Sequence, residues 1–157
     1  MTSFFVFLHV AAAILLLGPV VVATSMFPGQ AAESRGGNEE AAGRASILHT
    51  ISSRYGLFSL FVPLLGAAVL ISGWDVYKTN YWIHTAIVLS IIAWAVLYLV
   101  VLPQQRKLMS VLSHQGPQGQ GDASEFEGAK AKATAGAGVF NLLWIIALVL
   151  MFLPHPA

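Results

Sequence analysis

The sequence predicts an all-α integral membrane protein: a four-helix bundle of antiparallel, up-and-down topology with helical cytoplasmic extensions. Its 157 residues are 57% hydrophobic and only 10% charged, whereas soluble domains are about 25% charged. Four stretches lack Asp, Glu, Lys and Arg over the ~20 residues that a helix needs to cross the hydrocarbon core. Continuous apolar runs such as AIVLSIIAWAVLYLVVL do not alternate as barrel strands would. We expect one domain over residues 1–157.

The four predicted spans are residues 4–25, 55–73, 81–102 and 133–153. No Lys or Arg precedes the first, and it exceeds the apolar core of a signal peptide, so we expect it to be retained.

The connections between the spans also carry helix signals. Asn38 is a suitable N-cap for a helix that continues into the second span. The apolar spacing of the third span continues toward His114. Ser124 and Glu127 have the spacing of a capping box, so we expect the last helix to begin near Ser124, well before it enters lipid.

The basic residues predict the orientation. Only Lys78 lies in the second connection, and by the positive-inside rule the first and third connections are then cytoplasmic. Both termini are expected outside. Trp74 and Trp82 flank the second connection, at headgroup level. The seven basic residues of the first and third connections are Arg35, Arg44, Arg54, Arg106, Lys107, Lys130 and Lys132.

Composition excludes several classes of function. The formal net charge is +1, which leaves no strong field to attract nucleic acid. There is no cysteine, which excludes disulfides, iron–sulfur ligation and thiol nucleophiles. The spans carry no ionisable Asp, Glu, Lys or Arg, and coupled transport commonly requires such residues. This absence lowers the expectation of a transporter or channel.

Small residues predict where the helices pack closely. Thr134 and Gly138 form a small face on the last span, and we expect it to meet a similar face on the second span. Asn141 is expected to hydrogen-bond between helices. Pro19 and Pro63 are each expected to kink a helix. The predicted face of the second span comprises Gly56, Ser59, Pro63, Gly66, Leu70 and Gly73.

Histidines are the candidate ligands. His9 lies about five residues into the first span, roughly 8 Å at 1.5 Å per residue, and His84 enters the third span to a similar depth. Two facing imidazoles are suitable axial ligands of a b-type haem. With His155 they are an alternative site for copper or zinc. A third interpretation is that each ring only hydrogen-bonds to another helix or faces the headgroups. His49 and His114 are interpreted as surface residues.

Four segments together resemble a family of bacterial four-span membrane proteins known as domain of unknown function 2269. They are LHVAAAILLLGP, RYGLFSLFVPLLGAAVLISGW, YWIHTAIVLSIIAWAVLYLVVLPQQRKL and WIIALVLMFLPHP. The resemblance implies a four-span fold in a bacterial plasma membrane but no established activity. Copper-resistance D proteins and HemJ-type protoporphyrinogen oxidases are more distantly similar. In the latter an early His ligates haem, and His9 matches it by placement. The family features in this chain are Leu8, His9, Pro63, Gly73, Pro103, Arg106, Lys107 and Met151.

Three functions follow as hypotheses. The first is a non-catalytic accessory, assembly or scaffold subunit that associates with other membrane proteins or with copies of itself, for example in a respiratory or photosynthetic complex. It rests on the packing faces, the charge-free spans and the short external segments. The second is a haem-binding or metal-binding redox protein that uses His9 and His84. The third and weakest is a transporter of small solutes or metals.

Overall fold

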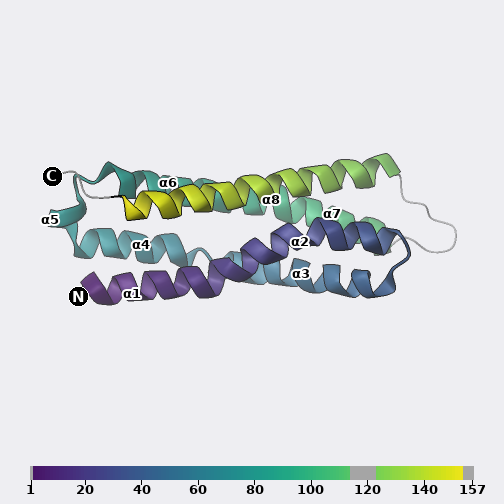
Figure 1. The fold of residues 1–157 in the computed structure, drawn as a ribbon, viewed down its shortest axis with the longest axis horizontal. Coiled ribbons are helices and arrows are strands. Elements are labelled where there is room, and N and C mark those ends of the chain that lie inside the picture. The colour runs from purple at the N-terminus through teal and green to yellow at the C-terminus, as the bar shows by residue number, and fades with distance from the viewer. Residues whose placement is uncertain (1, 114–122, 154–157) are drawn as a thin grey trace.

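The structure is a computed structural model that describes residues 2–113 and 123–153. These residues form four long apolar helices, each long enough to cross a membrane. The helices lie side by side along the long axis, and both chain ends are at the same end of the bundle (Figure 1). The predicted all-α membrane bundle is therefore confirmed. In chain order the elements are α1 (Thr2–Ala12), η1 (Ala13–Leu17), α2 (Gly18–Arg35), α3 (Glu39–Phe58), α4 (Phe61–Ser72), α5 (Trp74–Tyr77), α6 (Tyr81–Val96), η2 (Leu97–Val101), α7 (Leu102–Ser113) and α8 (Ala123–Phe152).

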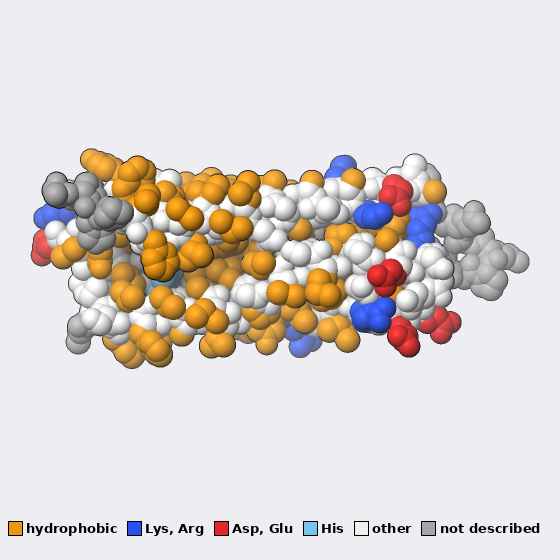
Figure 2. Space-filling model, in the orientation of Figure 1, with side chains coloured by type: hydrophobic (Ala, Val, Ile, Leu, Met, Phe, Trp, Pro, Cys, Tyr) orange, Lys and Arg blue, Asp and Glu red, His pale blue; other side chains and the backbone are white. Residues whose placement is uncertain are grey.

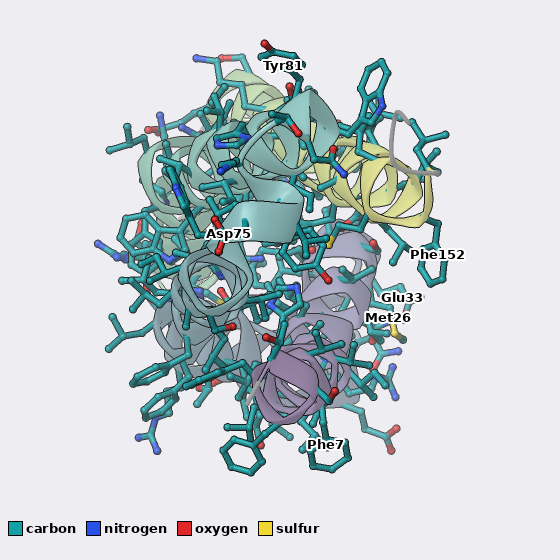
Figure 3. The ribbon with its side chains drawn as sticks, turned by 90° about the vertical axis from the view of Figure 1, so that its left-hand side faces the viewer. Phe7, Met26, Glu33, Asp75, Tyr81 and Phe152 are labelled. Atoms are coloured by element: carbon teal, nitrogen blue, oxygen red, sulfur yellow. The ribbon has the colours of Figure 1, made fainter. Side chains whose placement is uncertain are left out.

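Charged side chains are unevenly distributed over the bundle. Most of those visible gather at the end away from α5, a few lie at the α5 end, where Lys78 pairs with Asp75, and orange apolar side chains cover much of the face between (Figure 2). Viewed from the end with α5, the labelled Phe7, Met26 and Phe152 project outward (Figure 3), and each is at least half exposed. Such apolar outer side chains suit a helix bundle whose surroundings are lipid.

Helical extensions at the charged end begin largely as predicted. Asn38 caps α3, since its side-chain oxygen accepts a hydrogen bond from the Ala41 amide at 3.2 Å. At the same end the described part of α8 starts at Ala123, so Ser124 lies within the helix rather than at its cap. Exposed ion pairs such as Lys107–Glu125, 3.0 Å apart, join neighbouring extensions, but pairs of this kind contribute little to stability.

Prolines interrupt the spans in two ways. Near Pro63 the second long helix breaks at Ser59 and Leu60, between α3 and α4. The Ser59 carbonyl accepts a hydrogen bond from the Val62 amide at 3.0 Å, which satisfies it although Pro63 has no donor. In the first long helix the π-helical turn η1 ends just before Pro19, and in the third η2 ends just before Pro103. Wide turns are a known way to accommodate an interrupted hydrogen-bond ladder.

The small face of the second span packs closely, although not against the partner that we predicted. A Cβ atom on Gly56 would lie 2.9 Å from the side chain of Leu97 in η2, and one on Gly73 would lie 3.4 Å from the side chain of Thr2 in α1. Ser59 is buried in the same interface and bonds the Gly56 carbonyl. The second span therefore meets the first and third spans.

The prediction that Thr134 and Gly138 meet the second span is wrong. Thr134 is exposed, and a Cβ atom added to Gly138 would find nothing within 4 Å. The buried positions of this helix include Gly136, where an added Cβ would lie 3.0 Å from Val101. The face of α8 that packs in the bundle is thus rotated away from the predicted one, because apolar composition does not indicate which side of a span is internal.

Candidate binding pocket

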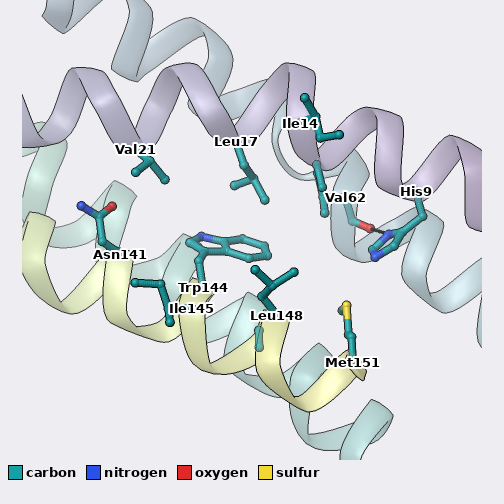
Figure 4. A pocket seen from close by; sticks show the side chains of 12 residues that line it. His9, Ile14, Leu17, Val21, Val62, Asn141, Trp144, Ile145, Leu148 and Met151 are labelled. Atoms are coloured by element: carbon teal, nitrogen blue, oxygen red, sulfur yellow. Dashed lines mark hydrogen bonds between the residues drawn. The ribbon is translucent and has the colours of Figure 1, made fainter. Parts of the chain in front are cut away.

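A cavity of about 310 Å³ lies between the first and last long helices, beside α1 and the C-terminal part of α8. Twelve side chains from α1, η1, α2, α4 and α8 line it (Figure 4). Ile14, Ile145 and Leu148 line it while remaining 66%, 58% and 56% exposed on the outer surface. The cavity therefore opens sideways, on apolar surface that faces lipid if the helices span a membrane.

His9 is the most polar group at one end of the pocket. Its Nδ1 lies 2.9 Å from the carbonyl oxygen of Val62 in α4. A carbonyl only accepts hydrogen bonds, so Nδ1 carries the hydrogen and Nε2 of the neutral ring is an acceptor. Figure 4 shows this second nitrogen on the side of Met151. The hydrogen bond to another helix matches one of the three interpretations of His9 made from the sequence.

Gly66 makes room for the imidazole. A Cβ atom at this position would lie 3.2 Å from Cε1 of His9 and 3.5 Å from Nδ1. The ring therefore rests against bare backbone of α4, and the predicted packing role of Gly66 concerns a side chain rather than a second helix backbone. The carbonyl that accepts the hydrogen bond from His9 belongs to Val62, the residue before Pro63.

Asn141 and Trp144 define the other end of the pocket. The Asn141 amide donates to Ser25 Oγ at 2.8 Å, and that hydroxyl donates to the Val21 carbonyl at 2.7 Å. This chain of donors fixes the amide orientation and joins α8 to α2, as expected for an interhelical hydrogen bond. Within the described residues, Oδ1 of Asn141 and Nε1 of Trp144 are buried without a hydrogen-bond partner. Each such atom destabilises the fold by about 1–3 kcal/mol.

His84 does not line this pocket. Its Nδ1 lies 2.9 Å from the carbonyl oxygen of Asn80, one turn earlier in the chain. The pocket thus contains one of the two predicted haem ligands, His9. The third member of the predicted metal set, His155, lies outside the described residues. Across residues 2–113 and 123–153, no three His, Cys, Asp or Glu side chains come together as a metal site.

The sequence does not predict a second polar cluster, because its key residue lies on an extension helix. Gln105 of α7 is fully buried. Its side-chain oxygen accepts from Nδ1 of His49 at 3.0 Å, and its amide donates to Ser52 Oγ at 3.3 Å. His49 is therefore half-buried against α7 rather than a surface residue as predicted. His114 lies outside the described residues.

The pocket residues Trp144 and Met151 were also not predicted as site residues. Met151 is one of the features that carry the family resemblance, but nothing in an apolar run distinguishes a pocket-facing side chain from a lipid-facing one. In comparisons with known proteins the chain matches no family model, no curated protein and no solved structure. The resemblance to the four-span family of unknown function accordingly stays a prediction.

Proposed function

We propose that this chain is a non-catalytic membrane protein that takes a single-chain, lipid-soluble molecule from the bilayer into the pocket between α1 and α8. The observation that carries the proposal is the sideways opening, whose rim includes the exposed Ile14, Ile145 and Leu148. An apolar cavity with a few placed polar groups is the usual form of a small-molecule site. A ligand dissolved in lipid would reach this one without crossing water.

The dimensions support an unbranched ligand. On α8 the lining extends from Asn141 to Met151, which is ~15 Å at 1.5 Å per residue. A slot that is long relative to its volume of about 310 Å³ suits an extended, unbranched molecule rather than a compact one.

Photo-crosslinking tests the proposal. The protein is reconstituted in lipid nanodiscs with a fatty chain that carries a photoreactive group, and the labelled residues are mapped by mass spectrometry. We expect labelling at Leu17 and Trp144, and Ala13→Phe should reduce it several-fold by filling the slot. Val22→Phe, at an exposed position on α2, is the matched control and should leave the labelling unchanged. Equal labelling of the pocket in both variants would contradict the proposal.

The second candidate function is the accessory, assembly or scaffold subunit predicted from the sequence. It is favoured by the outward side of α8, where Ala131, Thr134, Ala135 and Gly138 are all exposed and small. Small residues let the backbones of two membrane helices approach closely, so this face suits a helix of another membrane protein or of a second copy. We expect Gly138→Leu, but not Val139→Leu, to abolish co-purification of a partner in mild detergent. Isolation of the unmodified chain as a lone monomer in several detergents would argue against this function.

Haem remains the alternative occupant predicted from the sequence. In both His9 and His84 the Nδ1 atom bonds a backbone carbonyl, which is the usual arrangement when Nε2 ligates a metal. An absorption spectrum after haem-replete expression decides this alternative. A Soret band that disappears in His9→Ala and in His84→Ala would support it, and the absence of any band would exclude it.

The proposal includes an orientation of the chain in the membrane. The extensions with most basic residues are assigned to the cytoplasm and both termini to the outside, in a bacterial plasma membrane. The pocket then lies in the outer leaflet.

A further inference from the structure

We infer that the ligand of this pocket carries a neutral hydroxyl head group, which donates a hydrogen bond to Nε2 of His9, while its hydrocarbon tail follows the slot toward Asn141. This inference rests on the proposed function, since it names the chemistry of the molecule that the pocket would take up.

The state of His9 determines what the head group must offer. Because Nδ1 donates to the Val62 carbonyl at 2.9 Å, the neutral ring presents only an acceptor on its other side. That side faces the pocket next to Met151 (Figure 4), whose thioether sulfur is also an acceptor only. A ligand that itself only accepts, such as an ether or a ketone, therefore finds no donor at this end. A hydroxyl supplies the missing hydrogen.

Charge excludes the acidic head groups. No Asp, Glu, Lys or Arg lines the pocket, so a carboxylate or phosphate there would be an ion without a counter-ion in a medium of low dielectric constant. The nearest charged group in sequence to the pocket lining of α8 is Lys132, which lies nine residues before Asn141, or roughly 14 Å along the helix. A neutral head group avoids this cost.

The positions of His9 and Asn141 along the bundle determine which way the ligand would point. His9 is seven residues after Thr2, the first residue that the structure describes, and so lies ~10 Å along α1 from that residue. The Asn141 end lies nearer the middle of the bundle, because α8 continues to Phe152 beyond it. A single-chain alcohol would thus lie with its head toward the membrane surface and its tail toward the centre, in the same direction as the lipids of that leaflet.

Competition against the photoreactive chain tests the inference. The competitors are a saturated fatty alcohol, its methyl ether and the carboxylate of equal chain length, each added to the unmodified protein in nanodiscs at a pH where the acid is ionised. We expect the alcohol to compete about tenfold better than the ether, the size of one hydrogen bond in a binding constant, and better than the carboxylate. In His9→Leu the alcohol and the ether should compete equally.

The outcomes separate the inference from the proposed function. If alcohol and ether compete equally in the unmodified protein, or if the carboxylate competes best, the inference is overturned while pocket labelling still supports lipid uptake. If pocket labelling is insensitive to Ala13→Phe and no competitor reduces it, the proposed function fails as well. The comparison in the unmodified chain needs no variant, so it remains decisive even where His9→Leu does not fold. A Soret band that disappears in His9→Ala would assign the pocket to haem and overturn both.

Discussion

At the scale of single residues, the environment of His9 illustrates what the sequence can indicate. An imidazole in an apolar run predicts an interaction with another helix, and the Val62 carbonyl provides it. Which group bonds to His9 depends on α1 lying beside α4, and no local sequence pattern encodes that arrangement. The same holds for Gly66, whose spacing predicts close packing but whose contact is the histidine ring.

Substitution of Gly66 tests this contact. In Gly66→Ala the new methyl group lies 3.2 Å from Cε1 of His9, so the ring must move, and we expect the free energy of unfolding to fall by about 1 kcal/mol or more. The matched control is Gly43→Ala on the exposed part of α3, where an added Cβ meets nothing within 4 Å; there stability should rise by about 0.5–1 kcal/mol. Thermal unfolding in detergent measures both. Equal shifts in the two variants would contradict the proposed contact.

At the scale of elements, the existence and order of the helices could be predicted, but not the rotation of each helix about its axis. In water an amphipathic pattern indicates the buried face. In lipid the outer face is apolar too, so that pattern fades within the spans. This is why Thr134 and Gly138 were assigned to an internal contact and the pocket side of α8 was missed. The extensions outside the spans contain polar residues again, so local signals can be recognised there. The prediction of Asn38 as a helix cap is confirmed.

The buried Gln105 makes α7 depend on α3. Gln105→Ala removes the hydrogen bonds to His49 and to the buried Ser52, and we expect a loss of about 1–3 kcal/mol in the free energy of unfolding. Gln104→Ala is the matched control, since Gln104 is only half-buried, and it should cost less than half as much. Urea or thermal unfolding of the two variants gives the comparison. If both variants unfold alike, the cluster does not hold the two helices together.

At the scale of the whole molecule, the separation of a charged end from an apolar end was predictable from composition alone, because charge is expensive inside a bilayer. The sideways cavity could not be predicted from composition, because it lies where the first and last long helices diverge. Overall topology is therefore set by where charges are absent, whereas the candidate site is set by how four helices pack.

The proposed orientation is testable because the chain contains no cysteine. Single variants Lys78→Cys and Ser46→Cys place one thiol at each end of the bundle, at exposed or half-exposed positions. A membrane-impermeant maleimide added to intact cells should label Lys78→Cys at once and Ser46→Cys only after permeabilisation. The reverse pattern would invert the assignment of inside and outside, and would move the pocket to the inner leaflet.

The wide turns at η1 and η2 have a consequence for how such chains vary in length. A turn closed from residue i to i+5 holds one residue more than an ordinary α-turn, and one residue corresponds to ~100° of rotation about the axis. Loss of a single residue inside η1 or η2 would therefore be absorbed by straightening the turn, leaving α2 and α7 facing the same neighbours. The helix α8 contains no wide turn. A one-residue deletion in it before Trp144 would therefore rotate every later side chain, including Trp144 and Met151, about the helix axis and away from its present neighbours.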